Sequence, residues 1–327
     1  PRISVFFLLV LVSQDLITKE NFIWWLTGLY YLRLLIMIGY SLSLYKPSLS
    51  YTLPKNFKEI VSYSIYILLA GSAASLLIDI DKYMIPQKEA ISQTAYYAVA
   101  VFIATVVEIP GRAMFQILNP MVAKAINNND FNNLNDLYQR SSSNLLIICG
   151  FFFLLINLNI VSFYKLMNNE FYSDAILVVL IISIAKLIQM SFGCGPAILA
   201  TSSFYKITLP FSISMAISVY FLNDYLIDLY GINGAAISTL IVLFLFTILK
   251  VLYINFKLKI HPYNLNTIKI ISVICLVYFV FGLFQLDFDP LFNIILKSIF
   301  ISLVYISLVY FLKLSKTINN TIDSLIK

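Results

Sequence analysis

Long apolar runs recur along the whole chain, and they constrain its fold more than any other feature. Each run holds roughly 20 residues, which as an α-helix is enough to cross a hydrocarbon core ~30 Å thick. The runs lack alternation with a period of two and are too long for barrel strands, so helices are predicted. Hydrophobic residues make up 60% of the sequence and charged residues 12%, against about 45–50% and about 25% in soluble domains. The sequence therefore predicts an all-α, polytopic membrane protein.

We expect about ten membrane-spanning helices, of which the first is shorter than the others. Their approximate ranges are 2–14, 22–45, 60–80, 91–118, 144–164, 175–200, 207–223, 232–254, 269–286 and 291–312. The stretch 46–59 contains Pro47, Pro54 and three lysines, which is typical of a linker between two helical bundles. The Asn-rich stretch 119–143 carries apolar residues at helical spacing, which predicts a short helix on the inner membrane face.

Lysine and arginine residues are distributed unevenly between the two sides of these helices. When both ends of the chain are placed on one side, most basic residues outside the spans fall on that side. Only Lys19, Lys82, Lys88 and Lys165 fall on the other. Because basic loops tend to stay in the cytoplasm, we expect both ends to be cytoplasmic. This bias accounts for the net charge of +6, so no nucleic-acid partner is expected.

Several charged residues fall within the predicted spans, where they are expected to face protein or water rather than lipid. Arg33 and Lys186 lie near mid-span, and with Arg112 they form a cationic set whose chemistry suits phosphate. Structural alternatives stay open, since Arg33 can pair with an acid elsewhere and Arg112 can pair with Glu108, four residues earlier. Arg112 is also close enough to a span end to reach the interface, and Lys297 is interpreted in that way.

Residues that usually carry catalysis are sparse in this sequence. Its one histidine, His261, lies in a loop, and neither a phosphate-binding glycine loop nor a metal-ligand spacing is present. We therefore expect no enzyme activity, no cofactor and no metal. Asp79 and Asp81 do resemble the acidic motif of glycosyltransferases that use polyprenyl-phosphate sugars, but the large outer loop of those enzymes is missing. Three cysteines lie within apolar runs and are expected to be free, buried thiols: Cys149, Cys194 and Cys275.

Two stretches carry a resemblance to a known family. The stretch 75–85, which includes Asp79-Ile80-Asp81-Lys82, followed by 95–100 and Pro110, resembles the seventh and eighth helices of the Wzx-type polysaccharide flippases. These flippases belong to the MATE-related MOP exporter superfamily. The turn at 230–239 resembles that family's turn between the eleventh and twelfth helices. Family members usually have twelve to fourteen helices in two bundles, with both ends cytoplasmic.

This resemblance implies a fourteen-helix, two-bundle MOP-type transporter, of which four helices would precede Pro1. It assigns 1–45 to the last two helices of the N-terminal bundle and 46–59 to the cytoplasmic linker between the bundles. Residues 60–256 would form the six-helix C-terminal bundle, and 257–327 two additional helices and a cytoplasmic tail.

The implied function is transport by alternating access. An undecaprenyl-diphosphate-linked oligosaccharide would move from the inner to the outer leaflet of the bacterial cytoplasmic membrane, for the synthesis of O-antigen, capsule or exopolysaccharide. The expected partners are this lipid-linked oligosaccharide, membrane lipid and other polysaccharide-assembly proteins. Two further hypotheses are a MATE-type exporter of small molecules and a membrane polymerase or glycosyltransferase that uses polyprenyl-linked sugars.

Site residues follow partly from burial and partly from the resemblance. The predicted positions of Arg33, Arg112 and Lys186 inside membrane spans assign them to a cationic cavity that binds the substrate. Asp81 and Lys82 match the family's acidic–basic pair at the outer end of helix seven. With Glu108, they are candidates for coupling or gating, and simple capping of the helix stays open as an alternative.

Overall fold

The computed structural model describes residues 8, 11–12, 18–45, 53–167, 175–283 and 289–326. Within this part of the chain every regular element is a helix and no strand is present. Two short 3-10 turns, η1 (Thr105–Glu108) and η3 (Tyr205–Ile207), interrupt the α-helices. The α-helices are α2 (Lys19–Leu44), α3 (Phe57–Lys88), α4 (Ile91–Ala104), α5 (Ile109–Asn127), α6 (Phe131–Leu166), α7 (Ile176–Ser191), α8 (Gly195–Thr201), α9 (Thr208–Leu258), α10 (Leu265–Leu283), α11 (Pro290–Phe311) and α12 (Lys316–Ile326).

Within the described residues, six helices are long and apolar enough to cross a membrane, or seven if the bent pair α7–α8 forms one span. The chain is therefore an all-α, multi-pass membrane protein. The predicted total of ten spans stays a prediction, and most of the first predicted span, 2–14, lies outside the described residues.

The chain divides into two compact units, residues 1–58 and 59–327. In the first, α2 begins at Thr18, whose Oγ1 accepts a hydrogen bond from the Asn21 backbone N–H at 3.4 Å. Large apolar side chains of α2 are exposed all around the helix, as Trp24 and Leu35 illustrate. A helix that is apolar on every face is typical of a membrane span. The second unit holds nearly all of α3 and every later helix.

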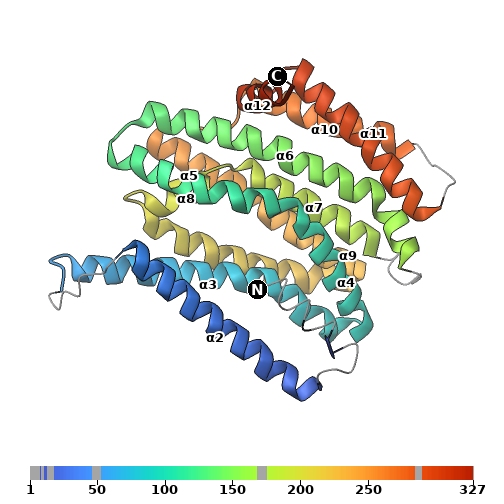
Figure 1. The fold of residues 1–327 in the computed structure, drawn as a ribbon, viewed down its shortest axis with the longest axis horizontal. Coiled ribbons are helices and arrows are strands. Elements are labelled where there is room, and N and C mark those ends of the chain that lie inside the picture. The colour runs from blue at the N-terminus through green and yellow to red at the C-terminus, as the bar shows by residue number, and fades with distance from the viewer. Residues whose placement is uncertain are drawn as a thin grey trace. The chain divides into compact units, whose positions relative to one another are not determined.

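Helix α6 is the central element of the second unit, because α5, α7, α10 and α11 all pack along it (Figure 1). Leu145 and Leu154 of α6 are completely buried in one core with Ile270 of α10 and Ile301 of α11. The Tyr305 hydroxyl donates a hydrogen bond to the Ile147 carbonyl at 2.9 Å. The last two apolar helices are thus part of the same core as the helices before them.

The expectation of a separate surface helix within 119–143 is wrong. Helix α6 runs without interruption from Phe131, and α5 extends to Asn127. Leu134 and Tyr138, whose spacing suggested an interfacial helix, are completely buried against α5 and α8. The spacing correctly indicated a helix with an apolar face, but protein covers that face rather than lipid.

A break between α7 and α8 lies at Gly193, as the sequence Gly193-Cys194-Gly195-Pro196 predicts. Gly193 has φ +57°, in the left-handed region that glycine adopts without a steric penalty. The two helices are bent by 54°. Helix α6 holds the bend, because Ser142 Oγ donates to the Ser191 carbonyl at 2.6 Å and Ser141 Oγ accepts from the Cys194 N–H at 2.9 Å.

Helix α9 is a hairpin of two arms that meet at Gly231, which has φ +56° and ψ −136°. A single straight helix of its 51 residues would be about 77 Å long, more than twice the thickness of a membrane core. Contacts between the arms show that the chain turns back, since the ring of Phe211 packs against that of Phe246 at 6.3 Å. The predicted tight turn at Gly231-Ile232-Asn233-Gly234 is confirmed.

The end of α3 is attached to the first arm of this hairpin by an ion cluster. Lys88 Nζ lies 2.8 Å from Asp224 Oδ1 and 2.9 Å from Asp228 Oδ2. Hydrogen bonds to the Asp224 and Asp228 carboxylates raise the pKa of Lys88, which stays charged. The cluster connects the end of α3 to the end of the first arm of α9, close to the Gly231 turn.

Gly234 provides a test of the hairpin. A Cβ atom at Gly234 would lie 1.9 Å from the Leu226 carbonyl oxygen, whereas one at Gly282 in α10 would meet nothing within 4 Å. Overpacking against backbone costs about 1–3 kcal/mol, so we expect Gly234→Ala to lower the thermal unfolding midpoint of the detergent-purified protein. Gly282→Ala should leave the midpoint unchanged or raise it slightly, because alanine has the higher helix propensity. Equal midpoints for the two variants would contradict the close contact between the arms.

Candidate functional site

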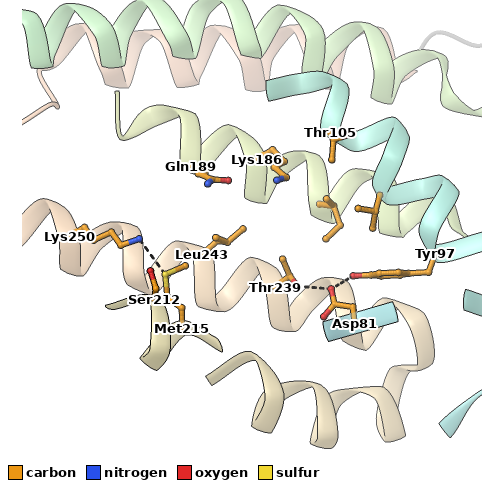
Figure 2. Close-up of a pocket in the computed structure, with 12 residues that line it drawn as sticks. Asp81, Tyr97, Thr105, Lys186, Gln189, Ser212, Met215, Thr239, Leu243 and Lys250 are labelled. Atoms are coloured by element: carbon orange, nitrogen blue, oxygen red, sulfur yellow. Dashed lines mark hydrogen bonds between the residues drawn. The ribbon is translucent and has the colours of Figure 1, made fainter. Parts of the chain in front are cut away.

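Polar side chains within the second unit gather around an interior cavity of about 170 Å³. Its walls are α3, α4, η1, α7 and both arms of α9, and Figure 2 shows the lining residues. Asp81 and Tyr97 lie at one end of the cavity and Lys250 and Ser212 at the other. Its remaining polar lining residues are Thr105, Lys186, Gln189 and Thr239.

Asp81 is the most enclosed acid of this site, with only 3% of its surface exposed. Its carboxylate accepts hydrogen bonds from the Tyr97 hydroxyl, from Asn223 Nδ2 at 2.6 Å and from Thr239 Oγ1 at 3.1 Å. These donors come from α4 and from the two arms of α9. Buried carboxylates need such donors, because the charge has lost its water.

Asp81, expected at the outer end of a membrane-spanning helix, is enclosed by protein. Helix α3 continues past it, through Pro86, to Lys88, so Asp81 faces the helices packed against α3. Lys82 pairs instead with Asp79 at 2.9 Å, and the side chains are 41% and 67% exposed, respectively. Residues two apart on a helix point in different directions. Asp79 and Asp81 therefore lie in different environments, one exposed and one buried.

Glu108 connects two basic side chains at a break in the helix. It ends the 3-10 turn η1, just before Pro110 in the first turn of α5. Its Oε1 lies 2.5 Å from Arg112 Nη2, which confirms the pair predicted from their spacing, and its Oε2 lies 2.9 Å from Lys186 Nζ on α7. The Lys186 side chain is 10% exposed and that of Arg112 is 63% exposed. Lys186 is thus an interior cation with a counter-ion, while Arg112 reaches the surface of this unit.

The predicted cationic set is only partly brought together. Lys186 lines the cavity. Arg112 binds the same Glu108 carboxylate as Lys186 does, but Arg112 does not line the cavity. Arg33 belongs to the first unit, where its side chain is exposed on α2. Its expected position in one cleft with Lys186 stays a prediction.

Lys250 also lines the cavity, although the distribution of basic residues predicts a position on the cytoplasmic side for it. Its Nζ lies 3.3 Å from Met215 Sδ on the opposite arm of α9, and it forms no salt bridge with any described acid. The spacing of Thr239, Leu243 and Lys250 places them on one face of the second arm, and all three line the cavity. That spacing was the available signal for Lys250.

The cavity therefore has an acidic group at one end and a basic group at the other. Thr239, beside Asp81, and Lys250 are eleven residues apart on one helical arm, or about 16 Å. Between them lies Gln189, whose side-chain oxygen is buried and has no hydrogen-bond partner in the described part of the chain. This arrangement can bind small ions and polar groups.

Metal-ligand geometry and the cysteines were also predicted from the sequence. No group of three or more His, Cys, Asp or Glu side chains there has the geometry to hold a metal ion. The three cysteines are free, as expected, but Cys275 is exposed on α10 and only Cys149 and Cys194 are buried.

Comparisons with known proteins give no relative. The chain matches no protein-family model, and no curated protein or solved structure is detectably similar to it. The geometry of the cavity and the sequence patterns are therefore the basis for a functional proposal.

Removing single charges tests the pairing of Glu108 with Lys186. Loss of one partner of a buried ion pair costs up to about 3–5 kcal/mol, because the other charge stays buried. Glu108→Gln leaves Lys186 without a counter-ion, so it should lower the thermal midpoint most. Lys186→Met should cost less, since Arg112 still pairs with Glu108. The double variant should recover part of the loss.

Arg112→Gln is the matched control for these variants. Its side chain is 63% exposed, and exposed ion pairs contribute only about 0–1 kcal/mol. A midpoint for Arg112→Gln as low as that for Glu108→Gln would contradict the assigned roles.

Proposed function

We propose that this protein is a transporter that moves an undecaprenyl-diphosphate-linked oligosaccharide from the inner to the outer leaflet of the bacterial cytoplasmic membrane. It would act by alternating access, with both chain ends cytoplasmic and with no chemistry of its own. The observation that carries the proposal is a cavity lined by the ionisable side chains of Asp81, Lys186 and Lys250 within a unit of apolar helices. Ionisable groups at membrane depth are costly and are typical of pathways for polar substrates.

The positive groups favour an anionic cargo. Lys186 and Lys250 line the same cavity, and ammonium groups in a low-dielectric interior attract phosphate strongly. The resemblance to polysaccharide flippases in the stretches around Asp81 and Gly231 suggests which phosphate compound it would be. A cavity of about 170 Å³ holds a few water molecules or one phosphate group, not an oligosaccharide. On this proposal the sugars would occupy space that opens during the transport cycle.

A MATE-type exporter of small molecules is the second candidate, and Asp81 is the observation that favours it. A buried carboxylate surrounded by hydroxyl and amide groups can hold a proton or a small cation. Such a group could couple either transporter to an ion gradient, or it could bind a cationic substrate directly. The two candidates differ in which end of the cavity binds the cargo.

Lys250 distinguishes them. In a bacterial strain that lacks its own flippase, we expect the protein to restore surface polysaccharide and Lys250→Ala to reduce this rescue at least tenfold. Lys250→Arg, which keeps the charge, should retain most of it. Lys269→Ala, which removes an exposed lysine of α10, is the matched control. Full rescue by Lys250→Ala, at equal expression, would argue against an anion site at that end of the cavity.

Asp81→Asn tests coupling separately. The amide keeps the shape of the carboxylate but loses its charge, so a gradient-coupled carrier should become insensitive to the gradient. In proteoliposomes we expect a proton or sodium gradient to accelerate transport by the unmodified protein and to leave the variant at its basal rate. Glu59→Gln, which changes an acid at the start of α3 outside the cavity, should still respond to the gradient. An identical response of Asp81→Asn would remove Asp81 from coupling.

A further inference from the structure

The turn after α11 forms a second polar pocket, of about 380 Å³, on the opposite side of α6 from most of the helices that line the interior cavity (Figure 1). It lies immediately beyond the last residue of an apolar helix long enough to span a membrane. Its lining includes Tyr310, Lys313, Lys316, Asn319, Asn320 and Asp323. None of these residues lines the interior cavity.

The backbone fixes the position of Lys313. This residue has φ +50°, and the next N–H, of Leu314, donates to the Val309 carbonyl at 3.2 Å, an arrangement that ends a helix firmly. Leu314 and Ser315 are buried, and Ser315 Oγ donates to Asn144 Oδ1 of α6 at 2.6 Å. The turn is therefore attached to the central helix of the unit.

Helix α12 forms the other wall and is connected back to α11. Asn319 Nδ2 donates to the Tyr310 carbonyl at 2.8 Å, and the Tyr310 hydroxyl donates to Asp323 Oδ1 at 2.7 Å. Ile318 packs against the core formed by α6, α10 and α11. The sequence of α12 places apolar residues at 318, 322, 325 and 326 and polar residues between them. An amphipathic helix of this kind is typical of the membrane–water interface.

The pocket carries an excess of positive charge. Neither Lys313 nor Lys316 forms a salt bridge with an acid in the described part of the chain. The acid of the pocket, Asp323, already accepts a hydrogen bond from Tyr310. A ligand that suits this pocket has an anionic group for the two lysines.

We propose that the pocket binds the headgroup of an anionic phospholipid of the surrounding bilayer, such as phosphatidylglycerol. The phosphate of this headgroup lies between Lys313 and Lys316. The acyl chains extend along the apolar surface of α11, where Phe311 is 78% exposed. Basic residues just beyond a membrane span attract anionic lipid in this way. The proposal is independent of the transported cargo.

The test is lipid binding to the purified full chain. After detergent has removed endogenous lipid, the protein is titrated with phosphatidylglycerol or with phosphatidylcholine of the same acyl chains, and bound lipid is counted by native mass spectrometry. We expect preferential binding of phosphatidylglycerol and a weakening of at least tenfold in Lys313→Gln/Lys316→Gln. Lys313→Arg/Lys316→Arg should bind within about threefold of the unmodified protein, because it keeps both charges.

Lys257→Gln/Lys259→Gln is the matched control. Lys259 follows α9 in the same left-handed conformation, with φ +56°, and the double change removes the same charge from a different helix end. The proposal is overturned if this control weakens binding as much as the pocket variant. It is also overturned if the pocket variant binds normally, or if phosphatidylcholine binds as well as phosphatidylglycerol.

Asp323→Asn keeps the test decisive if the lysine variants fail to fold. The amide still accepts from the Tyr310 hydroxyl but removes the negative charge of the pocket. We expect phosphatidylglycerol to bind several-fold more tightly to this variant. Unchanged or weaker binding would overturn the proposal.

Discussion

The buried carboxylate of Asp81 constrains the interior of the second unit more than any other group. An anion removed from water is destabilising unless several donors reach it together. Its donors come from α4 and from both arms of α9, while Asp81 itself belongs to α3. Asn223 and Thr239 would be about 24 Å apart on one continuous helix. Both can reach a single carboxylate only because the chain reverses at Gly231, so the hairpin and the buried acid depend on each other.

The pair of Glu108 and Lys186 is a second constraint of the same kind. It connects η1 to α7 at the point where the helix changes from 3-10 to α geometry before Pro110. Because Glu108 is also held by Arg112, the interior amine and the surface guanidinium share one counter-ion. Lys250 then differs from the other interior charges, because no described acid offsets it. The cavity is therefore electrostatically asymmetric along its length.

Local sequence predicted those features of the fold that depend on local chemistry. The breaks at Gly193 and Gly231 follow from the backbone freedom of glycine, and the pair of Glu108 and Arg112 follows from helical spacing. The class of fold followed from the length of the apolar runs. None of these inferences requires knowledge of which helices are neighbours.

The burial of Asp81 and the position of Lys250 could not be predicted in the same way, because both depend on tertiary contacts. Low hydropathy near the end of an apolar run predicts that a charged residue lies outside the span. This prediction fails where a partner from a distant segment compensates the charge. Asn223 and Thr239, which compensate Asp81, are 142 and 158 residues away in sequence. The spacing of Tyr138 likewise predicted a helix correctly but predicted a lipid-facing position wrongly, since residues of other helices cover its side chain.

The charge asymmetry of the cavity bears on how a carrier of this design would be driven. An anion that enters beside Lys250 meets a cation with no acid to displace, so its attraction is not reduced by a competing pair. To reach Lys186 it must compete with Glu108, which holds that amine at 2.9 Å. If the protein has the proposed function, binding of the anion beside Lys250 would therefore be favourable without rearrangement. Binding of the anion to Lys186 would separate η1 from α7, the two elements that the pair of Glu108 and Lys186 connects. Release of Glu108 by the cargo would then be the event that links occupancy of the cavity to a change in helix packing.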